Sequence, residues 1–198
     1  MKKTLSIILC MILICLSFTA CGGPNADLTE ENITKTVKVT EKALKEFDVK
    51  SLNKYVDSAT LSTIVGYSQG HQQFADLGTK IFENLKVEIT EIDIENKTVT
   101  LAVINKDLYD VAGNFARELK KNYSTFQLIT KLNDDDFLDR KLNALSEKID
   151  EAQMLESSTE IVLSIEQSKN NLVLIFDEGA EDVVSGGALS AIKSIYSY

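Results

Sequence analysis

The chain has no tryptophan, a single proline, a single histidine (His71) and no cysteine after Cys21. Residues 22–198 therefore have no disulfide, no thiolate metal site and no cysteine nucleophile, so the fold must rest on its apolar core alone. With one histidine and no serine in a Gly-x-Ser-x-Gly elbow, a nucleophilic triad is close to excluded.

Positive charge is also scarce, because the chain has 21 Lys and Arg but 30 Asp and Glu, which gives a formal net charge of −9. Removal of residues 1–20 would take away Lys2 and Lys3 and no acids, and would move this charge to −11. Phosphate binding relies on clustered Lys and Arg, so the charge argues against a nucleic-acid partner and against electrostatic attraction to anionic lipid.

A mainly apolar segment, Leu5–Phe18, follows the basic residues Lys2 and Lys3. It is too short to span a bilayer, which needs roughly 20 apolar residues. A basic start, an apolar core and the small residues Thr19 and Ala20 are the three regions of a secretory signal.

Phe18-Thr19-Ala20-Cys21 resembles the lipobox of bacterial lipoproteins, which usually has Leu where Phe18 stands. The resemblance implies cleavage between Ala20 and Cys21, a diacylglycerol thioether on Cys21, and acylation of the new amino terminus by a fatty acid such as palmitate. Two or three acyl chains hold a protein on a membrane where one chain does not. We therefore expect a lipid-anchored protein on the extracytoplasmic face of the cell membrane.

These features predict three segments: a lipoprotein signal peptide (1–20), a lipidated tether (21–28) and a single α+β domain (29–198). Apolar residues at helical spacing predict helices, period-two alternation predicts one antiparallel hairpin, and apolar runs on either side of a turn predict a second. The expected helices run from about Asp27 to Phe47, from Asp48 to Val56, from Leu61 to Leu85 with a break near Gly66–Gly70, from Asp107 to Phe126, from Asn133 or an adjacent aspartate to Ile149, and from Glu181 to Tyr196. The expected hairpins are Val87–Val103, with a bulge near Thr90-Glu91, and Ile161–Phe176, whose continuous apolar second strand indicates burial on both faces or a central place. This order fits helices packed on one side of a curved antiparallel sheet made of the two hairpins.

The chain resembles a group of small Gram-positive lipoproteins with an NTF2-like, cone-shaped α+β domain. The residues that carry the resemblance are the lipobox, the helical opening Thr34–Val56, the hairpin Leu85–Ile104 and the closing Ser185-Gly186-Gly187-Ala188-Leu189. The resemblance implies no particular activity, although NTF2-like enzymes use a carboxylate or histidine with a tyrosine inside an apolar cone.

The segment Tyr67–Gln73 is the one polar, aromatic and uncharged cluster that could line the mouth of such a cone. Tyr67 and His71 are therefore the candidate pocket residues. The alternative is a solvated turn between helices, with His71 on the surface or capping a helix.

Two further motifs favour structural roles. Asp134-Asp135-Asp136, with Asp139, offers clustered carboxylates, but the spacing lacks the glycine and glutamate of an EF-hand, so helix capping is the expected role. Ser185-Gly186-Gly187 lacks the lysine of a phosphate loop and is interpreted as a flexible or close-packed start of the last helix. No metal and no cofactor are expected.

The leading hypothesis is a non-catalytic module of the cell envelope that binds a small ligand or an envelope protein. One alternative is a small NTF2-like acid–base enzyme, and another is a structural or assembly factor of an envelope complex.

The lipid anchor is tested by Cys21→Ala, which removes the only sulfur that the lipobox offers. We expect a full-length precursor without the lipid mass when membrane fractions are analysed by mass spectrometry. A processed, lipid-bearing product from this variant would disprove the assignment.

Overall fold

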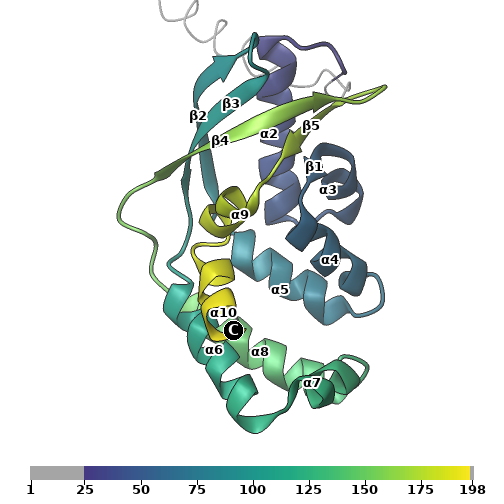
Figure 1. Ribbon diagram of the computed structural model, residues 1–198, viewed down its shortest axis with the longest axis vertical. Coiled ribbons are helices and arrows are strands. Elements are labelled where there is room, and N and C mark those ends of the chain that lie inside the picture. The colour runs from purple at the N-terminus through teal and green to yellow at the C-terminus, as the bar shows by residue number, and fades with distance from the viewer. Residues whose placement is uncertain (1–24, 197–198) are drawn as a thin grey trace, which may run out of the picture.

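The computed structural model describes residues 25–196, so the predicted signal peptide, Cys21 and the first part of the tether lie outside the described residues. Figure 1 shows the sheet at one end of the molecule and a group of helices at the other. The helices are α2 (Glu30–Lys45), α3 (Val49–Tyr55), α4 (Ala59–Ser68), α5 (Gln72–Phe82), α6 (Tyr109–Asn122), α7 (Thr125–Lys131), α8 (Asp135–Glu151), α9 (Glu178–Val184) and α10 (Ala188–Tyr196). The strands are β1 (Val56–Asp57), β2 (Lys86–Asp93), β3 (Thr98–Ile104), β4 (Thr159–Gln167) and β5 (Leu172–Ile175). Among the described residues, none of the helices has the length and hydropathy of a membrane span.

The α+β class is confirmed, with one five-stranded sheet in the order β1-β5-β4-β3-β2. The hairpins β2–β3 and β4–β5 are antiparallel, and β3 joins them by pairing with β4. The predicted bulge is confirmed, because the β2–β3 register shifts between Ile89 and Glu91. The sheet is nevertheless mixed, since the two-residue strand β1 pairs parallel with β5. The expectation of a purely antiparallel sheet was wrong at this edge because Val56 reads as the end of a helix.

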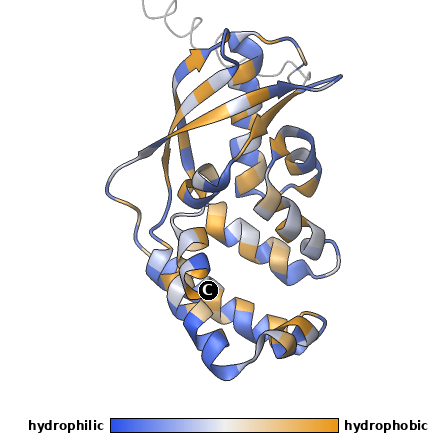
Figure 2. Cartoon of the chain, viewed as in Figure 1, coloured by the Kyte–Doolittle hydropathy of each residue, from blue (hydrophilic) through white to orange (hydrophobic). Residues whose placement is uncertain are grey.

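One face of the sheet is buried by helices. Val99 and Leu101 of β3 lie opposite Leu163 and Ile161 of β4, and all four are buried, whereas Val162 on the other face is 59% exposed. Buried residues of α2, α3, α4, α5 and α9 belong to the same core cluster. In Figure 2, orange segments run along β4 and β5 while the outer turns of α6 are blue. Strand β5 lies inside the sheet, between β1 and β4, which agrees with the continuous apolar strand predicted there.

Most helix starts follow from capping side chains. Thr29, Asp48 and Asp134 accept hydrogen bonds from first-turn amides of α2, α3 and α8, which satisfies otherwise unpaired donors. Asp107 accepts a hydrogen bond from the Tyr109 amide at 3.2 Å, although α6 itself begins only at Tyr109. The break predicted near Gly66–Gly70 is found between Ser68 and Gln72.

Two predicted helices are each divided in the structure. The helix expected to continue to Phe126 ends at Asn122, because Ser124 and Gln127 form a capping box that starts α7. The expected last helix is two helices, α9 and α10, separated by Gly186 and Gly187, which have φ angles of 63° and 81°. A side chain at Gly186 would collide with the carbonyl oxygen of Lys106, so this glycine is required for close packing as well as for its backbone conformation.

The segment after β3 joins the two ends of the molecule. The side-chain amide of Asn105 donates to the carbonyls of Ile81 at 2.9 Å and Val184 at 2.8 Å. The Lys106 Nζ atom donates to the carbonyls of Ile149 at 2.8 Å and Asp150 at 3.0 Å. Both side chains are buried, and they connect the sheet to the C-terminal ends of α5, α8 and α9.

The packing of α5 on the turn after α2 gives a test with a matched control. A Cβ atom at Gly78 would overlap the buried ring of Phe47, whereas one at Gly66, also inside a helix, meets nothing within 4 Å. We expect Gly78→Ala to lower the free energy of unfolding by about 1–3 kcal/mol through overpacking. Gly66→Ala should raise it by about 0.5–1 kcal/mol, because alanine favours the helix. Urea denaturation of both variants checks this, and equal stabilisation by both would contradict the packing described.

Candidate functional site

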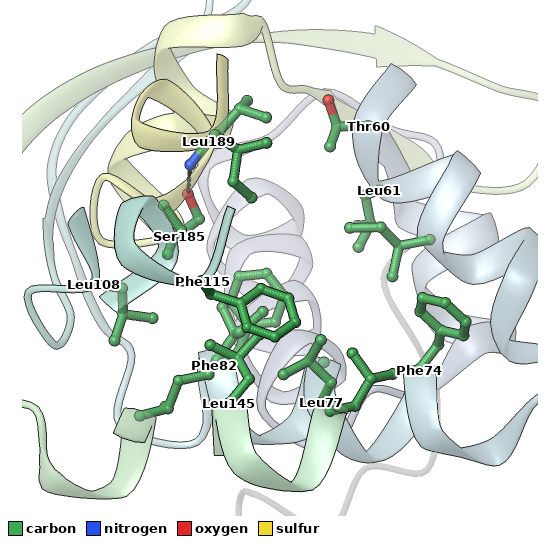
Figure 3. A pocket seen from close by; sticks show the side chains of 18 of the residues that line it. Thr60, Leu61, Phe74, Leu77, Phe82, Leu108, Phe115, Leu145, Ser185 and Leu189 are labelled. Atoms are coloured by element: carbon green, nitrogen blue, oxygen red, sulfur yellow. Dashed lines mark hydrogen bonds between the residues drawn. The ribbon is translucent and has the colours of Figure 1, made fainter. Parts of the chain in front are cut away.

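A cavity of about 450 Å³ lies among the helices, and of the strands only β1, through Val56, contributes to its described lining. Helices α2 and α4 to α10 all contribute to its walls, so it is bordered by residues from most of the domain. This volume lies within the range of about 300–1,000 Å³ that is typical of small-molecule sites. Figure 3 shows Phe115 near the centre of the lining, with Leu77 and Phe82 close to it and with Phe74 and Leu61 on the side of α4 and α5.

The walls are almost entirely apolar. Of the lining residues, only Ser58, Thr60, Lys141, Glu181 and Ser185 have polar side chains. Neither tyrosine nor histidine is among the lining residues within the described part of the chain. The cavity therefore presents a surface that suits a hydrocarbon, and it offers few groups for acid–base chemistry.

Some helices carry apolar residues on more than one face, and the residues that do not pack into the core line the cavity. Leu77 and Ile81 of α5 and Phe115 of α6 stand at positions that the sequence assigns to buried faces, yet each is only partly buried. They border the cavity instead of packing fully against opposite side chains. Large apolar residues left in this state are typical of a ligand site and not of a filled core.

Glu181, the one acidic residue in the lining, is 9% exposed and belongs to α9. Its Oε1 atom accepts from the Ser58 hydroxyl at 2.5 Å and from the Thr60 amide at 3.0 Å, and its Oε2 atom accepts from the Thr60 hydroxyl at 2.6 Å. These bonds connect α9 to the start of α4, more than 100 residues away in the chain.

Burial raises the pKa of the Glu181 carboxyl, but the hydrogen bonds from Ser58 and Thr60 and the charge of Lys193 together lower it by more. The net pKa lies below the ordinary value of 4.5, so Glu181 is ionised at neutral pH. A general base or acid that works near pH 7 would need the opposite shift.

The other polar side chains of the lining are also partnered. The Ser185 hydroxyl donates to the Asp182 carbonyl at 2.9 Å and accepts from the Leu189 amide at 3.4 Å, which Figure 3 marks with a dashed line. The Lys141 Nζ atom donates to Glu118 Oε1 at 2.6 Å. The walls therefore present an apolar surface in which the polar groups are already bonded to the protein.

The candidate residues Tyr67 and His71 lie beside the cavity and do not line it. Tyr67 is 43% exposed and its ring centroid is 5.5 Å from that of Phe74, which does line the cavity. His71 stands before the first turn of α5, and its Nδ1 atom is 3.1 Å from Asp135 Oδ1. Ala20 and Cys21, the predicted cleavage and lipidation residues, lie outside the described part of the chain.

The acidic cluster before α8 has structural partners. Asp134 caps α8, Asp135 faces His71, and Asp139 accepts from the Gln73 side chain at 2.6 Å. Within residues 25–196, no group of three or more His, Cys, Asp or Glu side chains is arranged to hold a metal ion.

Sequence reasoning did not single out Glu181, Ser58 or Thr60. One signal was available, since Glu181 stands between Ala180 and Val184 on the buried side of a short helix, where a charge needs a partner. The partner could not be identified because Ser58 and Thr60 are distant in the sequence.

Comparison of the chain with models of protein families, with curated proteins and with solved structures finds no match.

The depressed pKa of Glu181 predicts a pH-dependent contribution to stability. Because its pKa is lower folded than unfolded, this contribution is complete above about pH 4.5 and is lost as the pH falls through the folded value. Glu181→Gln should lower the free energy of unfolding by about 1.5–3 kcal/mol at pH 7, because it weakens buried bonds to a charged acceptor. The difference in free energy of unfolding between the variant and the unsubstituted chain should shrink below about pH 4.5.

Glu178→Gln is the matched control, because Glu178 lies on the same helix, has an exposed side chain and pairs with Lys193. We expect it to change stability by at most about 1 kcal/mol. Urea denaturation at pH 7 and pH 3.5 checks both variants. A loss in Glu181→Gln that is the same at both pH values would contradict the ionised state assigned here.

Proposed function

We propose that this chain is a membrane-anchored extracytoplasmic lipoprotein whose domain binds a small apolar ligand without catalysis. The observation that carries the proposal is the cavity, about 450 Å³ in volume, whose walls are apolar and whose polar side chains are internally bonded. Such walls offer hydrophobic contact to a ligand, which contributes about 25 cal/mol for each Å² of apolar surface removed from water.

The NTF2-like fold is part of the same proposal. A twisted sheet with one face covered by helices, and with an apolar cavity beside it, supports this assignment. Helices α6 to α8, inserted between β3 and β4, extend the simplest form of that fold and supply about a third of the residues that border the cavity.

Binding is favoured over acid–base catalysis by the state of Glu181. The carboxylate faces hydroxyls and an amide, it has a lowered pKa, and the lining described contains no tyrosine or histidine that could exchange a proton with it. Tyr67 and His71 remain candidates for the surroundings of the opening, since both rings lie close to Phe74.

The predicted anchor fits an apolar ligand. A tether of eight residues (21–28) that begins with a lipidated Cys21 would keep the domain close to the outer surface of the membrane. Apolar molecules concentrate in the membrane, so a tethered binding domain would meet its ligand there.

The absence of tryptophan from the whole chain makes a direct test possible, because any tryptophan fluorescence comes from an introduced residue. Phe115→Trp places the reporter in the cavity, and Phe126→Trp places it on α7 where the side chain is 75% exposed. The full chain, reconstituted in lipid vesicles, is titrated with 11-bromo-1-undecanol, whose bromine quenches tryptophan on close contact. We expect saturable quenching of Phe115→Trp and only weak, non-saturable quenching of Phe126→Trp.

Equal and non-saturable quenching of the two reporters would show that the ligand merely partitions into the vesicle, and the proposed function would then be wrong.

A further inference from the structure

The three residues Ser58, Thr60 and Glu181 form one polar cluster in the wall of the cavity, which is otherwise apolar apart from Lys141 and Ser185. The cluster lies on the sheet side, because α9 packs on β3 and β4 and Ser58 follows β1. Figure 3 shows Thr60 at the margin of the cavity, beyond Leu61.

The side-chain protons of this cluster are already used. The Ser58 and Thr60 hydroxyls and the Thr60 amide all donate to Glu181. The Ser58 oxygen in turn accepts from the Leu61 amide at 3.0 Å, which caps α4. The cluster therefore has no side-chain donor left to offer a ligand.

Acceptor capacity is left over. A carboxylate has about four acceptor positions, and three hydrogen bonds to Glu181 are described, two on Oε1 and one on Oε2, with the charge of Lys193 also acting on the carboxylate. The Thr60 hydroxyl oxygen also retains lone pairs after donating its proton. A group that reaches this margin can therefore form a hydrogen bond only if it donates one.

We propose that the cluster of Ser58, Thr60 and Glu181 is the head-group site of the cavity, and that it selects ligands with an apolar chain ending in a hydrogen-bond donor, a primary alcohol or a primary amine. This inference rests on the proposed function, since it names the class of ligand that the cavity takes. A carboxylate or phosphate head would bring negative charge against an ionised and buried Glu181, which costs binding energy.

Lys141 is the group in the lining that would favour an anionic head instead. It stands on α8, in the part of the molecule away from the sheet, and its Nζ atom is bonded to Glu118 at 2.6 Å. A ligand anion would have to compete with that carboxylate, so the geometry favours the donor head at Glu181.

The test uses the Phe115→Trp reporter in the full chain, reconstituted in vesicles and dialysed against reservoirs of fixed ligand concentration, so that partitioning into lipid does not change the free concentration. Three quenchers are compared: 11-bromo-1-undecanol, its methyl ether and 11-bromoundecanoate. The ether differs from the alcohol by one extra carbon and the loss of the donor. If apolar contact alone decided affinity, the ether would bind about fourfold more tightly.

We expect the alcohol to bind at least about tenfold more tightly than the ether, because a hydrogen bond to a charged acceptor contributes enough binding free energy for that difference. Glu181→Gln in the reporter background should reduce this preference to about threefold or less, because the carboxamide is a weaker acceptor and has donors of its own. Glu178→Gln should leave the preference unchanged. The comparison among ligands on the unsubstituted cluster stands even if Glu181→Gln fails to fold.

Saturable quenching in which the ether binds as tightly as the alcohol would overturn the head-group site and leave the proposed function in place. Tightest binding by the undecanoate, weakened by Lys141→Met, would also overturn it and would place the head at α8. An absence of saturable quenching by all three ligands would instead count against the proposed function itself.

Discussion

Three helix C-termini meet at the two residues that follow β3, and the arrangement of the whole domain depends on this point. The last carbonyls of a helix have no partner within the helix and carry its negative dipole end. The Asn105 amide bonds carbonyls at the ends of α5 and α9, and the Lys106 ammonium group bonds two at the end of α8. One amide and one cation thus satisfy groups from three helices in a buried place, and they hold the helices against the end of the sheet.

The same point helps to keep the cavity open. Helices α5 and α8 both end there, and along their length they are joined by polar contacts: His71 with Asp135, Gln73 with Asp139, and Lys80 with Asp150. Their apolar residues line the cavity. On the opposite side Glu181 fastens α9 to the start of α4. A collapse that filled the cavity would have to break these bonds. The three contacts between α5 and α8 are exposed and can be exchanged for water, but each buried group left unpaired at Asn105, Lys106 or Glu181 would cost about 1–3 kcal/mol.

The sequence predicted those features that depend on neighbouring residues. Alternation located β2, β3 and the bulge, apolar runs on either side of a turn located β4 and β5, and the expected capping aspartates located the starts of α3 and α8. It did not predict β1, because two residues have no periodicity. It did interpret Gly186 and Gly187 as a flexible or close-packed start of the last helix, and α10 begins directly after them. It also continued one helix from Glu181 through these glycines, because the Lys106 carbonyl that requires Gly186 lies about 80 positions earlier in the chain. It missed Glu181 as a site residue for the same reason, since its partners Ser58 and Thr60 are brought to it only by the fold. A cavity has no local signal at all: Leu77 or Phe115 has the same pattern whether it meets a side chain or a space.

The open side of the cavity bears on its cost. The scale of about 24 cal/mol for each Å³ applies to closed cavities in protein cores, and this cavity is partly open to solvent, so leaving it unfilled costs less than that scale gives. Partly buried side chains of the lining, such as Leu77 and Phe115, nevertheless lack the contacts that a filled core would give them. An apolar ligand would supply those contacts. Ligand binding and folding would then both depend on the same apolar surface. Because the polar side chains of the wall are already bonded to the protein, the remaining lone pairs of Glu181 and Thr60 would determine which ligand head groups bind.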